Sequence, residues 1–528
     1  MNEPERPAFS EIGVSDFTEV QAPGLDEDVA TLESAAAAGA ALPAAERGEP
    51  LHTAHQVARR AWYGLLTQGV DKILPVVILL YLARALEPAA FGVYSFIIAY
   101  LAFFQIVSDY SIDTVLVRTM SQADARERDA MLHAGLGLKL TMALLSVAIS
   151  VALVGVASDH QTPSGLMAVA ALNLPTALGG AYRAWHRARL EIGALFAQAT
   201  LRAVLLAGCV YLAVTHGSGL MAIFASMSAA NLLTFVVIVF ALRRVVAPRI
   251  AFDLVRWRRL AGGVAPLMVN AFAMTLSLRI GQILLMTLRG PVDVGQLGAA
   301  ARVTEAFTLL PEALMISVYP LMAGLHARES PALLATAERS TRYLVVATGF
   351  PVVICAVQGR EIMRLLFGAP FEGAGAILSL LAFTALLSAT GTVILNLLVA
   401  THSERVLSRN TLAFAIVGAA ASWFAITQFG AVGAAAATLA TSAASQVSLA
   451  LLPATRRYVR ASLRSALRPL AAVAITVAVA SLAGLKGWPA MAVTLALYVG
   501  SVAALRVFGA SEWRLLRSLL AGRRPQQG

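Results

Sequence analysis

From Trp62 onward the chain is a succession of long apolar runs separated by short polar connections, and this pattern constrains the fold more than any other feature. A helix that crosses the hydrocarbon core of a membrane needs ~20 mainly apolar residues, and most of the runs reach this length. Hydrophobic residues make up 58% of the chain and charged residues only 13%. The sequence therefore predicts an all-α polytopic membrane protein with about fourteen transmembrane helices. The runs are 62–86, 90–117, 131–157, 165–185, 194–216, 220–242, 261–288, 295–325, 340–358, 373–400, 411–428, 431–453, 469–486 and 489–507.

A weak internal repeat divides these runs. The first and seventh runs each carry charge, Asp71 and Lys72 in one and Arg279 in the other, and each is followed by a short turn and a glycine-containing restart. Internal repeats are common in transporters, whose sites lie between the halves. We therefore predict two six-helix lobes, the N-lobe (56–258) and the C-lobe (259–453), followed by helices 13 and 14 (454–510). An acidic tail (1–55) and a basic amphipathic tail (511–528) flank them.

The distribution of basic residues predicts the orientation. If the N-terminus is cytoplasmic, the six inner connections hold 22 Lys and Arg and the seven outer connections hold 5. Basic residues collect on cytoplasmic loops, so both termini are expected in the cytoplasm. The net charge of +11 is explained by this orientation and not by nucleic-acid binding.

The segments outside the spans carry further predictions. Residues 1–50 have eleven acids against two Arg and no apolar run, which predicts a disordered tail and not a signal peptide. Arg243–Leu260 and Ser511–Arg524 combine Arg with Trp and Leu, so they are either interfacial helices or simple determinants of topology. Cys209 and Cys355 lie in apolar runs, which excludes a disulfide framework and a cysteine metal site.

Residues 81–122 contain the most distinctive local pattern. Glu87-Pro88 should end the first membrane helix, because proline disfavours helical backbone in the residue before it. Phe91-Gly92-Val93-Tyr94 restarts the chain, and the next span carries Asp109 and Asp113 one turn apart, with Arg118 at its exit. Carboxylates inside an apolar span usually face the interior of the bundle or an aqueous cavity.

This pattern, Ala-Leu-Glu-Pro-x-x-Phe-Gly-x-Tyr-Ser followed by a span ending Asp-Tyr-Ser-Ile, closely resembles polysaccharide (Wzx-type) flippases of the multidrug/oligosaccharidyl-lipid/polysaccharide (MATE-like) exporter superfamily. The resemblance continues over roughly residues 60–455. One departure is Gly281. Family members often carry an acid at this position, so this chain lacks any ion-coupling role that such an acid would have. The other matching segments are Leu297–Leu325, Leu366–Phe371 and Gln428–Ala434.

Charged residues inside the predicted spans are the candidate site residues, because burying one charge costs a few kcal/mol or more. Basic side chains around an aqueous cavity suit a diphosphate, whose charge they offset. Alternatively, Asp71/Lys72, Asp109/Arg118 and Arg302/Glu305 form structural ion pairs, and Lys139 extends to the inner interface. The candidate substrate-binding cations are Lys72, Arg118, Lys139, Arg202, Arg279 and Arg302, and the candidate proton or sodium sites are Asp71, Asp109, Asp113, Glu305 and Glu312, with Glu312 favoured because it follows Pro311.

The sequence contains no P-loop, no zinc-protease motif and no long catalytic loop, which favours a transporter over an enzyme. The resemblance implies a bacterial inner-membrane flippase for undecaprenyl-diphosphate-linked oligosaccharides of exopolysaccharide, capsule or O-antigen, working by alternating access. It also implies that the lipid tail follows helices 13 and 14. We expect no cofactor or metal; the partners are the lipid-linked oligosaccharide, membrane lipids and, through the acidic tail, other polysaccharide-assembly proteins. The alternatives are an ion-coupled multidrug or peptidoglycan-precursor exporter of the same fold, or a membrane enzyme.

Overall fold

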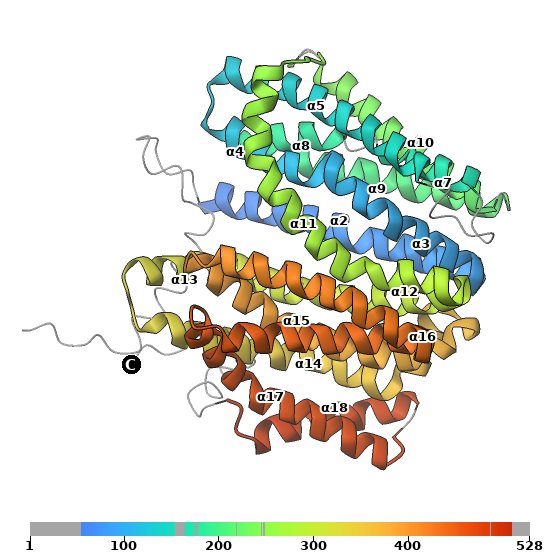
Figure 1. Ribbon diagram of the computed structural model, residues 1–528, viewed down its shortest axis with the longest axis vertical. Helices are drawn as coiled ribbons and strands as arrows, with labels where there is room; N and C mark the ends of the chain where they lie inside the picture. The colour runs from blue at the N-terminus through green and yellow to red at the C-terminus, as the bar shows by residue number, and fades with distance from the viewer. Residues whose placement is uncertain are drawn as a thin grey trace, which may run out of the picture. The chain divides into compact units, whose positions relative to one another are not determined.

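The computed structural model describes residues 54–153, 164–174, 178–217, 219–243, 245–246, 249–485 and 487–508, and these residues form helices and no strand (Figure 1). Residues 1–53 of the predicted acidic tail and all of the predicted basic tail lie outside this part. The N-lobe contains α2 (Ala54–Ala85), α3 (Pro88–Gln105), η1 (Ile106–Tyr110), α4 (Ser111–Gln122), α5 (Ala125–Ala152), α7 (Ser164–Ala171), α8 (Leu178–Ala188), α9 (Ile192–Thr215) and α10 (Gly219–Leu242).

The second half of the chain repeats the arrangement of long helices and ends in an antiparallel pair, α17 and α18. α17 packs on α14 and on α18 (Figure 1). The C-lobe contains α11 (Leu254–Arg289), α12 (Pro291–Glu305), η3 (Ala306–Thr308), α13 (Leu309–Ala327), α14 (Ala332–Phe367), η4 (Ala369–Ala374), α15 (Gly375–Ala400) and α16 (Glu404–Leu451), followed by α17 (Arg456–Leu482) and α18 (Trp488–Ala504).

Most of the predicted apolar runs coincide with these helices. The run 165–185 is divided into α7 and α8, and it is the run in which Asn173 and Pro175 made a continuous helix least favourable. The two runs 411–428 and 431–453 are the two legs of α16, which turns at Gly430 with φ 59°. Among the described residues, ten helices are long and apolar enough to cross a membrane, so the number of fourteen spans stays a prediction.

The helix ends follow the local chemistry of the sequence. Pro88 occupies the first position of α3, where its missing N–H costs no helical hydrogen bond, which confirms the predicted break at Glu87-Pro88. The last carbonyls of two other helices accept hydrogen bonds from arginines. Arg84 donates to the carbonyl oxygens of Leu365 and Leu366 at the end of α14. Arg289 donates to those of Ile426 (3.2 Å) and Thr427 (2.6 Å) near the turn of α16.

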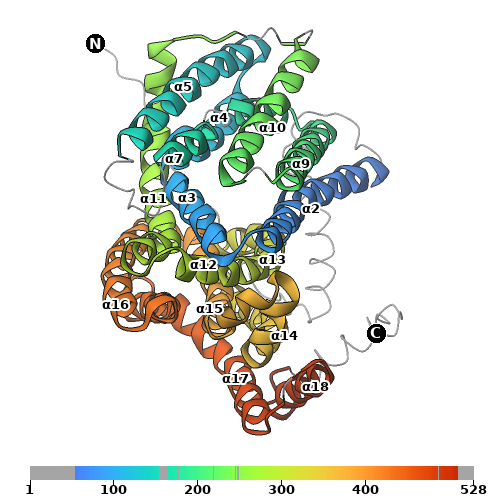
Figure 2. The ribbon, with the colours of Figure 1, turned by 90° about the vertical axis from the view of Figure 1, so that its right-hand side faces the viewer.

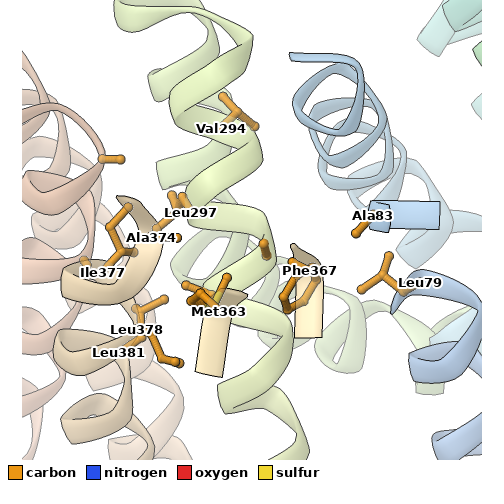
Figure 3. Close-up of a cluster of buried hydrophobic side chains, with 14 of the residues drawn as sticks. Leu79, Ala83, Val294, Leu297, Met363, Phe367, Ala374, Ile377, Leu378 and Leu381 are labelled. Atoms are coloured by element: carbon orange, nitrogen blue, oxygen red, sulfur yellow. The ribbon is translucent and has the colours of Figure 1, made fainter. Parts of the chain in front are cut away.

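The largest hydrophobic core joins helices of both lobes. It brings Leu79 and Ala83 of α2 together with Val294 and Leu297 of α12 and Phe367 of α14 (Figure 3). All five side chains are at least nine-tenths buried. Burial of apolar surface in this cluster therefore holds the two lobes in contact.

The predicted interfacial helix over Arg243–Leu260 is not continuous in the part that the structure describes, and only Leu254–Leu260 are helical, as the first turns of α11. Residues 249–253 have no regular secondary structure, and α11 begins only at Leu254. Ala251 donates its N–H to the carbonyl of His133 in α5 (3.1 Å), and Gly137 of α5 lies against the carbonyl of Ala251. This segment is held against α5 by its backbone, and Gly137 leaves the room for that contact.

Asp253 ends this connection as the N-cap of α11. The backbone N–H of Arg256 donates to the Asp253 carboxylate (3.0 Å), and so does that of Val255 (3.1 Å). These hydrogen bonds, the first of them foremost, lower the pKa of Asp253 below its usual value. Hydrogen bonds from Arg256 to Glu127 and Asp253 in turn raise the pKa of the Arg256 guanidinium.

Candidate functional site

The second helices of the two repeated units, α3 and α12, cross at their N-terminal ends (Figure 2). A methyl group at Gly92 would lie 1.7 Å from the carbonyl oxygen of Pro291, and one at Gly295 would lie 2.2 Å from that of Pro88. The two contacts are reciprocal, since each glycine meets the proline that starts the other helix. Only glycine permits this approach, so the predicted equivalence of the two glycine-containing restarts has a structural basis.

Both of these long helices are interrupted near their middle. α3 passes through the π-helical segment Ile106–Tyr110 before α4, whereas α12 passes through the 3₁₀ segment Ala306–Thr308 before α13. Such interruptions often mark functional hinges, and broken helices are typical of transporter sites. The predicted spans 90–117 and 295–325 correspond to the candidate membrane spans Pro88–Gln122 and Pro291–Ala327, and the interruptions lie inside them. Two of the candidate carboxylates, Asp113 and Glu305, lie close to the interruptions.

In the C-lobe, Glu305 joins two of the predicted cations. Its Oε1 lies 3.2 Å from Arg279 of α11, and its Oε2 lies 2.8 Å from Arg302 one turn earlier. The predicted pair Arg302/Glu305 is therefore confirmed, and Arg279 shares the same carboxylate. Glu305 is 40% exposed, so the group is open to solvent or ligand. Two guanidinium groups on one carboxylate leave an excess of one positive charge.

In the N-lobe, Lys139 of α5 forms an ion pair with Asp113 of α4. The Lys139 side chain is fully buried and that of Asp113 is 18% exposed. The alternative in which Lys139 extends to the membrane interface is wrong, because the amine is held inside the lobe. This pair is neutral as a whole, in contrast to the group around Glu305.

Arg202 of α9 takes Asp71 of α2 as its ion-pair partner, with 3.7 Å between guanidinium and carboxylate. From the sequence, Asp71 was considered as a partner of its neighbour Lys72, and this contact between two helices was therefore missed. Arg202 also lines a cavity of about 190 Å³ inside the N-lobe, together with Arg183 of α8, Gln198 and Asn231. The distribution of basic residues counted Arg183 with an inner connection, although its place within the predicted run 165–185 was a signal that it lies in the bundle.

The C-lobe contains a cavity of different chemistry. It has a volume of about 310 Å³ and lies between α11, α15 and both legs of α16. Its polar lining is made of hydroxyl and amide groups and contains no charged residue among those described. They are Ser277, Ser388, Thr392, Thr411, Ser422, Thr438, Thr441, Ser442, Ser445 and Gln446.

Four candidates remain, and the structure describes the side chains of two of them. Lys72 and Asp109 lie in α2 and η1, and their side chains are outside the described part of the structure. Arg118 is exposed on α4. Glu312 is exposed in the first turn of α13, where a negative charge interacts favourably with the helix dipole. Among the described residues, no three His, Cys, Asp or Glu side chains lie together as metal ligands.

An apolar groove of about 480 Å³ runs between α17 and α18. Ile475 and Val479 line it from α17, and Val493 and Leu497 line it from α18. Thr476 and Ser501 also line this groove, and their hydroxyls lie 2.7 Å apart.

Comparisons with solved structures show which known proteins share this fold. A structure described as the lipid II flippase MurJ in an inward closed conformation matches with a TM-score of 0.66 and 13% identity over 87% of this chain and 100% of that chain. Inward-facing and outward-facing structures of multidrug resistance MATE transporters of the MOP superfamily match with TM-scores of 0.59 and 0.53. The first is 10% identical over 76% of this chain and 99% of its own length, and the second is 12% identical over 77% of this chain and 95% of its own length.

The sequence itself was compared with curated proteins and with protein families. None of the curated proteins compared with the chain matches it. A family described as "Polysaccharide biosynthesis protein" matches residues 57–326, which is more than half of the chain. The chain therefore belongs to this polysaccharide biosynthesis family, the Wzx-type flippases, and has the MATE-like fold of the MOP superfamily.

Proposed function

We propose that this protein is a bacterial inner-membrane flippase that moves undecaprenyl-diphosphate-linked oligosaccharide repeat units for exopolysaccharide, capsule or O-antigen. The observation that carries the proposal is the group of Arg279, Glu305 and Arg302. Its excess positive charge is partly exposed beside a helix interruption. A diphosphate provides the matching negative charge, and guanidinium groups bind phosphate oxygens in forked geometry.

Transport proceeds by alternating access between the two lobes. The reciprocal contact of Gly92 and Gly295 with the opposite prolines closes the outer end of the bundle. With both termini in the cytoplasm, the diphosphate-sugar headgroup enters from the inner leaflet, and separation of α3 from α12 releases it outward. An ion gradient or the membrane potential drives the cycle, with Glu312, Glu305, Asp71, Asp109 and Asp113 as the candidate coupling groups.

The lipid tail remains in the bilayer during transport. The groove between α17 and α18 is apolar over most of its lining and large enough to receive part of a polyprenyl chain. This supports the expectation that the tail follows helices 13 and 14.

The second candidate is a flippase of a peptidoglycan precursor, because the solved structure described as a lipid II flippase shares the fold over its whole length. A multidrug exporter is a weaker alternative, since a cationic drug is repelled by paired arginines such as Arg279 and Arg302.

Reconstitution of the purified protein into liposomes tests these alternatives. Fluorescent undecaprenyl-diphosphate-linked oligosaccharide, fluorescent lipid II and a cationic dye are offered separately, and dithionite added outside quenches label that has reached the outer leaflet. We expect movement of the oligosaccharide lipid. Movement of lipid II alone would favour the second candidate, and chemical modification of either lipid would identify an enzyme.

The orientation is tested separately by cysteine labelling in cells. With Cys209 and Cys355 replaced by Ser, Asp293→Cys should react with an impermeant maleimide from outside, as should Asp159→Cys, a position outside the described residues. Labelling only after permeabilisation would contradict the proposed topology.

A further inference from the structure

One face of α17 joins a row of arginines to the apolar groove that this helix forms with α18. The face consists of Arg457, Arg464, Arg468, Ile475 and Val479, which follow one another by steps of seven or four residues. Such steps keep to one side of an α-helix, and α17 is one continuous helix over this stretch. The three arginines are exposed, and Ile475 and Val479 are 45% and 43% exposed. A basic section and an apolar section therefore follow each other along the outer side of α17.

The apolar section indicates the depth of this face in the membrane. Ile475 and Val479 line the groove, so they belong in the hydrocarbon layer. Arg468 lies seven residues before Ile475, which is ~10 Å along the axis at 1.5 Å per residue, and Arg464 lies ~6 Å further out. Leu467, between the two arginines in sequence, is 62% exposed. An exposed leucine beside exposed arginines is typical of the membrane interface, which is the depth of the lipid phosphates.

The arginines of this face have no acidic partner among the described residues. Neither α17 nor α18 contains an Asp or Glu. Arg460 donates to the carbonyl oxygen of Ala450 (2.9 Å) at the end of α16. Arg457, Arg464 and Arg468 form no hydrogen bond or ion pair with the part of the chain that the structure describes. Arg464 and Arg468 are one turn apart, where like charges repel, so an anion between them removes this repulsion.

Position and charge together select the ligand. A soluble anion matches the arginines but leaves the groove empty of hydrocarbon. A zwitterionic phospholipid brings an ammonium group, for which neither helix offers a carboxylate. A phospholipid with a net negative charge supplies a phosphate at the depth of Arg464 and Arg468 and an acyl chain on the side of Ile475. Basic clusters directly outside a membrane helix attract anionic headgroups in the same way.

We propose that α17 binds an anionic phospholipid of the inner leaflet, with the phosphate on Arg464 and Arg468 and one acyl chain in the groove between α17 and α18. The site is separate from Arg279 and Arg302, and binding requires no transport; only the choice of leaflet rests on the proposed orientation. The same groove is proposed above for the tail of the transported lipid. The phospholipid therefore occupies the groove between transport cycles, and that tail displaces it.

Native mass spectrometry of the purified full-length protein measures the binding. The delipidated protein in detergent is offered dioleoyl phosphatidylglycerol, dioleoyl phosphatidylcholine or glycerol 3-phosphate. We expect phosphatidylglycerol to bind at least tenfold more tightly than phosphatidylcholine, and glycerol 3-phosphate, which has no acyl chain, not to bind measurably. Equal binding of the two phospholipids would overturn the proposal. Binding of glycerol 3-phosphate as tight as that of phosphatidylglycerol would assign the arginines to a soluble anion and overturn it as well.

Variants locate the headgroup. Each arginine near a membrane surface contributes roughly fivefold to the affinity for anionic lipid, so Arg464→Gln/Arg468→Gln should weaken phosphatidylglycerol binding at least tenfold. Arg464→Lys/Arg468→Lys keeps both charges and should retain most of the binding. The matched control is Arg405→Gln/Arg409→Gln, which removes two exposed arginines one turn apart at the start of α16, a helix that lines no part of the groove. An equal loss in this control would assign the effect to net charge and refute the site.

The acyl chain is located separately. Val479→Trp fills the groove and should weaken phosphatidylglycerol binding several-fold, with the preference over phosphatidylcholine retained. Phosphatidylglycerol with a diazirine in one acyl chain, irradiated in nanodiscs, should label peptides of α17 and α18 more strongly than the corresponding phosphatidylcholine probe. No such enrichment would overturn the proposal, even if the double glutamine variant failed to fold.

The transported lipid is the competing occupant. Undecaprenyl diphosphate in excess should displace bound phosphatidylglycerol from the parent protein. Binding of undecaprenyl diphosphate that depends on Arg464 and Arg468, together with no binding of phosphatidylglycerol, would give the site to the transported lipid and refute the phospholipid. Because none of these measurements includes a transport step, their outcome is independent of whether the liposomes flip the oligosaccharide lipid.

Discussion

The two interrupted helices occupy equivalent places in the two lobes and hold their charges differently. Beside the interruption of the N-lobe, Asp113 and fully buried Lys139 form one pair with no net charge. Beside that of the C-lobe, Glu305 is shared by Arg279 and Arg302, and the group is both positive and partly exposed. The pair of Asp113 and Lys139 has the properties of a structural contact, whereas the group around Glu305 has those expected of the proposed binding site. Equivalent positions in a repeat therefore need not have equivalent functions.

Removing one partner of the buried pair should give the largest loss of stability. Lys139→Met leaves Asp113 without its ammonium partner, and breaking a buried pair costs about 3–5 kcal/mol, toward the lower end here because Asp113 is partly exposed. The double variant Asp113→Asn/Lys139→Met should recover most of the loss, since no orphan charge remains. Apparent melting temperatures in detergent measure both. A single variant as stable as the parent would contradict a structural role.

Arg279→Ala should have the opposite result, a loss of transport with little loss of stability. The group around Glu305 keeps Arg302, so the carboxylate retains one partner. We expect at least a tenfold lower flipping rate in liposomes and a melting temperature close to that of the parent. Arg279→Lys should recover part of the rate, because the amine keeps the attraction but loses the fork. Full activity of Arg279→Ala would remove this residue from the site.

Gly92→Ala and Gly295→Ala test the feature that the lobes share. Each new methyl group would overlap a carbonyl of the other helix, so the crossing of α3 and α12 should open. We expect both variants to slow transport to a similar extent and to increase labelling of a cysteine at Ser95, which is buried in the parent. Gly208→Ala on α9, where a methyl group meets nothing within 4 Å, is the matched control. An effect at Gly92 and none at Gly295 would show that the contact is not reciprocal in function.

The smallest expected effect concerns the connection between the lobes. The folded pKa of Asp253 lies below its unfolded value of about 3.9, so its stabilising contribution is present above that pH and is lost as the pH falls through the folded pKa. Asp253→Ala should therefore lower the melting temperature slightly at pH 7, with the difference vanishing as the pH falls below 4. A difference that does not decrease at all as the pH is lowered from 7 to 3 would exclude the ionised carboxylate as its source.

The features that repeat along the chain could be predicted from the sequence alone. The apolar runs predicted the helices, Glu87-Pro88 predicted a boundary, and the glycine restarts predicted the relation between Gly92 and Gly295. These features depend on composition and local backbone chemistry, which neighbouring residues largely determine.

Contacts between helices were not predictable in the same way. Asp71 was considered with its neighbour Lys72, but adjacent residues on a helix do not face each other, and Asp71 lies near Arg202 of another helix. Arg183 resembled a loop cation because α8 ends only a few residues later. The interruptions at 106–110 and 306–308 leave no mark in hydropathy, since they depend on packing across the bundle.

The crossing of α3 and α12 also has a consequence for the entropy of the cycle. Gly92 and Gly295 have no side-chain rotamers, so bringing the two backbones together orders no side chain at those positions. In a contact between long side chains, each closure would instead immobilise several rotatable bonds. A glycine crossing can thus be broken and re-formed on every turnover with little entropic cost, which leaves the choice between the two states to the bound lipid and the driving ion.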